Sequence, residues 1–112
     1  MFTQQLAIDK ATSFTKEILS NGLKLRKAIL FGSYANQTQH EFSDIDLCLI
    51  ADEFTGFGYE DVDYFVRIIN KKEFLLIEPK TYSTANYLNG DPFLNSEVNR
   101  TGIVIFDNLT NA

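Results

Sequence analysis

The chain has 112 residues and a net charge of −5, from fifteen acidic residues against ten lysines and arginines. A general nucleic-acid-binding protein needs a basic surface that displaces counterions from phosphates, so this charge disfavours that class. The content of 45% hydrophobic and 13% aromatic residues is typical of a globular chain and excludes a disordered one. We therefore expect one globular domain that spans residues 1–112.

The single cysteine, Cys48, cannot form an intramolecular disulfide, which is typical of a protein from a reducing compartment. No apolar run approaches the roughly 18 residues of a membrane span. The first ten residues, MFTQQLAIDK, lack the basic start and apolar stretch of a signal peptide. These features predict a cytoplasmic protein that does not enter the membrane, and they leave its oligomeric state open.

The first half of the chain alternates helical and strand patterns. Residues 3–21 are predicted to be a helix, because apolar residues recur at helical spacing before an Asn-Gly stop. Residues 27–31, KAILF, are predicted to be a short buried strand, which a Gly-Ser pair ends. Residues 33–37 can then form a short helix. Residues 44–50, DIDLCLI, are the second predicted strand, and their apolar character indicates burial on both faces of a sheet.

The second half continues the alternation. Residues 59–70 are predicted to be a helix, because apolar residues follow an i, i+3, i+4, i+7 pattern. Residues 73–79 read as a third strand that Pro79 stops. Asp91-Pro92 is a typical helix start, for a helix that ends at Gly102, and IVIFD is a final strand. The order predicts an α/β fold, a small mixed sheet with helices packed on it.

Two carboxylates lie at the start of the second strand. Because side chains two residues apart on a strand point to the same face, Asp44 and Asp46 project together, with their Cα atoms about 7 Å apart. Two neighbouring acids at the edge of a core are costly to ionise unless a cation joins them. Mg²⁺ prefers carboxylate oxygens, and it can stabilise the attacking and leaving oxygens of a phosphoryl or nucleotidyl transfer.

The Gly32-Ser33 pair ends the first predicted strand. A glycine lets a phosphate approach the backbone closely, and a serine at a helix start offers a hydroxyl and free N–H groups. We therefore expect Gly32 and Ser33 to bind a triphosphate, and we expect Asp44 and Asp46 to hold the metal that bridges it. A second Asp-x-Asp, Asp61-Val62-Asp63, lies in a predicted helix, where side chains two residues apart point in different directions and cannot share a metal. We therefore expect these two acids to lie in the solvated first turn of that helix.

The segment GSYANQTQHEFSDIDL resembles the signature of the minimal nucleotidyltransferase (MNT) domain of the DNA polymerase β superfamily: Gly-Ser, ten residues, then Asp-x-Asp. The resemblance implies the nucleotidyltransferase fold and Mg²⁺-dependent chemistry on a nucleotide. It also implies a third carboxylate on a neighbouring strand, which binds the metal and helps deprotonate the acceptor. Glu78 is the best match, and Glu73 is the weaker substitute.

The chain departs from the family pattern after the serine. Many relatives have Arg-Gly where this chain has Asn36-Gln37, so a positive charge and a flexible residue are missing near the expected phosphate site. His40, in the loop before the acids, reads as a surface histidine.

The resemblance implies transfer of AMP from ATP to an acceptor hydroxyl, most specifically a tyrosine of a partner HEPN toxin, with the chain as antitoxin. One alternative is an antitoxin that acts by binding alone, which the Asn36-Gln37 departure supports. The other is a small-molecule nucleotidyltransferase of the aminoglycoside type, which the lack of room for a second domain disfavours.

Overall fold

A mixed sheet of four strands, in the order β3-β2-β1-β4, forms the centre of the computed structural model, which describes residues 3–109. The strands are β1 (Leu25–Phe31), β2 (Ile45–Ala51), β3 (Ile77–Ser83) and β4 (Ile103–Asp107). Strand β1 is antiparallel to both β2 and β4, whereas β2 and β3 are parallel.

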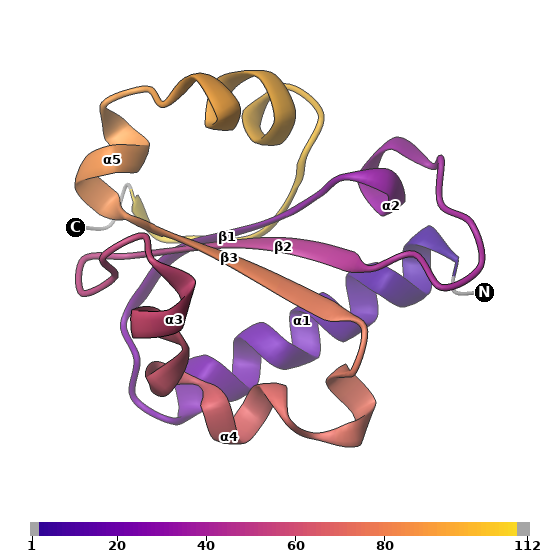
Figure 1. Ribbon diagram of the computed structural model, residues 1–112, viewed down its shortest axis with the longest axis horizontal. Helices are drawn as coiled ribbons and strands as arrows, with labels where there is room; N and C mark the ends of the chain where they lie inside the picture. The colour runs from indigo at the N-terminus through magenta and orange to yellow at the C-terminus, as the bar shows by residue number, and fades with distance from the viewer. Residues whose placement is uncertain (1–2, 110–112) are drawn as a thin grey trace.

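Helices cover both faces of the sheet (Figure 1). The α-helices are α1 (Gln4–Ser20), α2 (Ser33–Asn36), α3 (Gly58–Asp61), α4 (Val66–Ile69) and α5 (Thr84–Leu88). The 3₁₀ turns are η1 (Val62–Tyr64) and η2 (Lys72–Phe74), and η3 (Leu94–Asn99) is π-helical. The predicted α/β fold is confirmed. No helix within residues 3–109 is long and apolar enough to cross a membrane.

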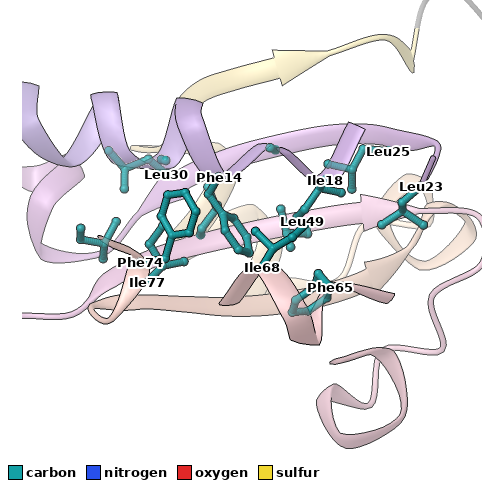
Figure 2. Close-up of a cluster of buried hydrophobic side chains, with 14 of the residues drawn as sticks. Phe14, Ile18, Leu23, Leu25, Leu30, Leu49, Phe65, Ile68, Phe74 and Ile77 are labelled. Carbon is teal, nitrogen blue, oxygen red and sulfur yellow. The ribbon is translucent and has the colours of Figure 1, made fainter. Parts of the chain in front are cut away.

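The α1 face of the sheet carries the larger core, part of which Figure 2 shows. Phe14 of α1 is fully buried, and its ring makes edge-to-face contacts with Phe74 and Phe65, with centroids 5.3 and 6.1 Å away. Such pairs add to the stabilisation from burial alone. The alternate residues Ile45, Leu47 and Leu49 of β2 also point into this core.

The opposite face of the sheet carries a second core beneath η3. Cys48 and Ile50 of β2 are buried there with Leu94 and Val98 of η3. The prediction that β2 is buried on both faces is therefore confirmed. Burial raises the pKa of the Cys48 thiol to about 12, although Lys80 and Lys27 oppose the shift.

The position of the third strand was predicted wrongly. Residues 72–74 form the turn η2, and β3 begins at Ile77 and continues through Pro79 to Ser83. Proline stops a central strand because it lacks an N–H, but it is tolerated at an edge, and β3 is an edge strand. Consequently Glu78 lies at the start of β3 and not near its end.

The predicted helix over residues 59–70 is also wrong in part, because the segment divides into α3, η1 and α4. The backbone leaves helical geometry at Phe65, where φ is −140° and ψ is 19°. Asp61, expected in solvent, is 1% exposed and accepts hydrogen bonds from Thr55 N, Gly56 N and Thr81 Oγ1 at 2.6–2.9 Å. Burial raises its pKa, but these hydrogen bonds outweigh burial and leave the pKa lowered.

Candidate functional site

The predicted site residues gather at one end of the sheet, where β1 ends and the parallel strands β2 and β3 begin (Figure 1). Phe31, the last residue of β1, is paired with Asp46 of β2. Gly32 follows directly, and α2 then turns the chain away from the sheet. The Gly-Ser turn and the Asp-x-Asp segment are therefore neighbours because an antiparallel strand pair joins them.

Gly32 occupies a position that only glycine fits. Its φ of 76° and ψ of −151° lie in a region that other residues essentially do not adopt. A Cβ atom built on Gly32 would also overlap Oδ2 of Asp46. The absent side chain thus lets the Asp46 carboxylate lie directly against the backbone of the turn.

The short helix α2 is held by polar contacts at both ends. Gln4 of α1 donates from Nε2 to the carbonyl oxygens of Tyr34 and Ala35 at 3.0 and 3.2 Å. Asn36 donates from Nδ2 to the Gly32 carbonyl oxygen at 3.1 Å. Gln37 adopts a left-handed φ of 56°, a conformation that favours glycine. The departure from the family pattern therefore has two effects. The neutral Asn36 side chain binds the backbone of the turn, and Gln37 takes a left-handed conformation that glycine would adopt with less strain.

Asp46 and Glu78 are direct neighbours across the parallel strands β2 and β3. Paired residues of adjacent strands point to the same face, so both carboxylates face the η3 side of the sheet. Burial raises the pKa of Asp46, and the negative charges of Asp44 and Glu78 raise it further. The structure therefore brings Asp46 and Glu78 together, and their mutual repulsion is not balanced by a salt bridge in the described part of the chain.

Asp44 lies one residue before β2, which starts at Ile45 and not at Asp44 as predicted. It is exposed, and it follows a tight loop in which His40 N donates to Ser43 Oγ at 2.9 Å and Ser43 N donates to the His40 carbonyl oxygen at 3.0 Å. The His40 side chain is exposed, and its Nδ1 lies 2.9 Å from the Glu41 carbonyl oxygen. His40 thus belongs to the loop surface, as expected.

An open cavity of about 300 Å³ lies over Asp46 and Glu78. This volume is at the lower end of the range for ligand pockets. The residues that line the cavity are Phe31, Asp46, Glu78, Pro79, Lys80 and Phe93. Glu73, the weaker alternative for a third carboxylate, lines a different cavity with residues of α1.

Four of the six residues that line this cavity were not predicted as site residues, and Lys80 and Phe93 are the two that bring a charge and an aromatic ring from outside β1 and β2. Lys80 lies beyond the predicted end of the strand at Pro79, although Thr81 and Tyr82 are typical strand residues and indicate that the strand continues. Phe93 follows the predicted helix start at Asp91, whose Oδ1 does accept a hydrogen bond from Phe93 N at 2.8 Å. No sequence pattern indicated that this turn would lie over the acids.

The chemistry of the site suits a hard divalent cation. Carboxylate oxygens are the ligands that Mg²⁺ prefers, and a cation would relieve the repulsion that raises the pKa of Asp46. Within residues 3–109, no three acidic, histidine or cysteine side chains converge as a complete ligand set. This agrees with the usual Mg²⁺ site in nucleotide enzymes, where one or two carboxylates act together with waters and substrate phosphates.

Comparisons with known proteins agree with this geometry. No curated protein sequence matches the chain significantly. Among solved structures, a candidate nucleotidyltransferase from Sulfolobus solfataricus superimposes with a TM-score of 0.67 at 14% identity, covering 93% of this chain and 83% of the other. A chain of a toxin-antitoxin complex with AMP-PNP gives a TM-score of 0.59 at 22% identity, covering 89% and 76%.

A third similar structure is a complex of a tri-AMPylated HEPN toxin from Shewanella oneidensis with its MNT antitoxin. It matches with a TM-score of 0.54 at 19% identity, and it covers 97% of this chain and 76% of the other. At these identities the likeness establishes the nucleotidyltransferase fold. The sequence model described as polymerase beta nucleotidyltransferase matches residues 14–111, most of the chain. The chain therefore belongs to the polymerase beta nucleotidyltransferase family.

Proposed function

We propose that residues 1–112 act as one minimal nucleotidyltransferase domain that moves AMP from ATP to an acceptor hydroxyl with the help of Mg²⁺. The observation that carries this proposal is the contact of Gly32 with Asp46, which has Glu78 as its neighbour on β3. The two carboxylates line one cavity, and the Gly32 turn lies against the Asp46 carboxylate, an arrangement that can bring a phosphate chain and a cation together.

In this proposal Gly32 and Ser33 position the phosphates. Asp44, Asp46 and Glu78 would hold the metal jointly with the nucleotide phosphates and waters, because within residues 3–109 the acids do not converge as a complete ligand set by themselves. The bound ion would neutralise charge on the phosphates. The acceptor oxygen forms a bond to the α-phosphorus of ATP, while the bond from that phosphorus to the bridging oxygen breaks and pyrophosphate leaves. Glu78, which is exposed, accepts the proton of the acceptor hydroxyl. Positioning and charge neutralisation account for most of the rate in such transfers.

For the acceptor, we propose a tyrosine of a partner HEPN toxin, so that the chain acts as an antitoxin. Glu78 is exposed and lines an open cavity, and Asp44 is exposed as well, which leaves a side chain of another protein access to these acids. The structurally similar complexes support this choice, because one contains an AMPylated HEPN toxin bound to an MNT antitoxin.

The experiment supplies α-labelled ATP and Mg²⁺ to the chain, with and without the proposed HEPN partner protein. We expect label on a tyrosine of that protein, lost in Asp44→Asn and retained in Asp63→Asn, which removes an exposed acid outside the site. If Asp44→Asn and the wild type silence the partner equally and no label moves, the chain acts by binding alone. If label moves to an aminoglycoside but not to the protein, the acceptor is a small molecule.

A further inference from the structure

Lys80 faces the same cavity as the two acids of the strand pair. Glu78 is opposite Asp46 in the parallel register, and Lys80 is opposite Cys48. Residues two apart on a strand point to one face, so the Lys80 side chain follows Glu78 along the η3 side of β3. Both residues line the cavity.

The Lys80 ammonium group has a defined place beside Phe93. Its Nζ lies 5.1 Å from the centroid of the Phe93 ring, which is a cation–π contact. Phe93 is itself packed edge-to-face on Phe31, with ring centroids 5.9 Å apart. Lys80, Phe93 and Phe31 line the cavity together, and Phe31 directly precedes Gly32 in the chain.

Lys80 forms no salt bridge within residues 3–109, unlike Arg26, Lys27 and Lys71, although Glu78 is only two residues away. Several exposed basic residues share this lack of a carboxylate partner, but Lys80 is the basic residue that lines the cavity over Asp46 and Glu78. Its charge is therefore not used to hold the fold together. An exposed ammonium group with an ordered position and no carboxylate partner is available to an anionic ligand.

The site needs such a cation. Asp44, Asp46 and Glu78 repel an incoming triphosphate, and Asn36-Gln37 offers no charge at the turn. We propose that Lys80 binds the β- and γ-phosphates of the nucleotide and stabilises the pyrophosphate that leaves, with Phe93 holding its ammonium group in position. The charge that develops on the bridging oxygen as its bond to the α-phosphorus breaks is then met by the Lys80 cation.

This inference rests on the proposed function, and equilibrium binding separates the two. We would titrate ATP, AMP and inorganic pyrophosphate, each with Mg²⁺, into the wild type by calorimetry. Lys80→Gln should weaken binding of ATP and pyrophosphate about tenfold or more and change AMP binding less than about threefold, because a charge-assisted contact to the phosphate tail is lost. Lys80→Arg should restore binding, and Phe93→Leu should give an intermediate loss.

Lys72→Gln is the matched control, because it removes the same charge from an exposed lysine in η2, outside the cavity. Equal ATP affinity in Lys80→Gln and the wild type would overturn the role of Lys80 and leave the proposed function standing. An equal loss for AMP and ATP would overturn the assignment to the phosphate tail. A wild type that binds none of the three ligands would overturn the proposed function and this inference together.

Discussion

Gly32→Ala tests the closest contact of the site, between the turn and the Asp46 carboxylate. The alanine must adopt a φ of 76° and a ψ of −151°, which costs about 1–3 kcal/mol of stability. Its Cβ would also overlap Oδ2 of Asp46, so the carboxylate must move. A displacement of about 1 Å at a reacting centre costs about 100-fold in rate. A typical domain is stable by about 5–15 kcal/mol, so the variant should fold and yet lose most of its transfer activity.

The matched control is Gly22→Ala, since Gly22 also has a positive φ, of 97°, but a Cβ there meets no atom within 4 Å. Urea denaturation should give a loss of about 1–2 kcal/mol for this control, because the backbone strain is of the same kind. Its rate of nucleotidyl transfer should equal that of the wild type. If Gly32→Ala transfers AMP as fast as Gly22→Ala, the contact between the turn and Asp46 does not position the carboxylate and our reasoning is refuted.

Two further predictions concern buried groups. Asp61→Asn should destabilise the fold by about 2–3 kcal/mol at pH 7 in urea titrations, because hydrogen bonds to a buried carboxylate are lost, whereas Asp63→Asn should change little. The pKa of Asp61 is lowered from its ordinary 3.8, so its contribution is complete above that pH and is lost as the pH falls through the folded-state value. A difference between variant and wild type that does not shrink as the pH is lowered below 3.8 would contradict this. Cys48, with its pKa raised to about 12, should react with a thiol reagent at pH 8 only when urea unfolds the chain, and rapid reaction of the folded protein would be inconsistent with its burial.

Much of the fold follows from local patterns in the sequence. The first helix was predicted because its apolar residues recur at helical spacing before an Asn-Gly stop. The two central strands and the final strand were predicted because they are short apolar runs, the first of which ends at Gly-Ser. The third strand was misplaced because whether Pro79 ends a strand depends on whether that strand lies at an edge, which is a property of the whole sheet.

The placement of the site residues could also be predicted from the sequence only in part. Strand alternation correctly placed Asp46 on one face with Cys48, and the family resemblance pointed to Glu78. The position of Glu78 beside Asp46 depends on the parallel register of two strands separated by about thirty residues, which no local pattern encodes. The burial of Asp61 was missed because its hydrogen-bond partner Thr81 comes from β3.

The most direct test of the account compares ATP labelled at the α-phosphate with ATP labelled at the γ-phosphate, each incubated with Mg²⁺, the wild-type chain and the helical partner protein. A nucleotidyltransferase transfers the α-phosphate and releases the γ-phosphate in pyrophosphate. We therefore predict stable labelling of the partner from α-labelled ATP alone, and none from either label with Asp46→Asn. Label that reaches the partner from γ-labelled ATP, or that is unaffected by Asp46→Asn, would contradict the central claim that this site transfers AMP.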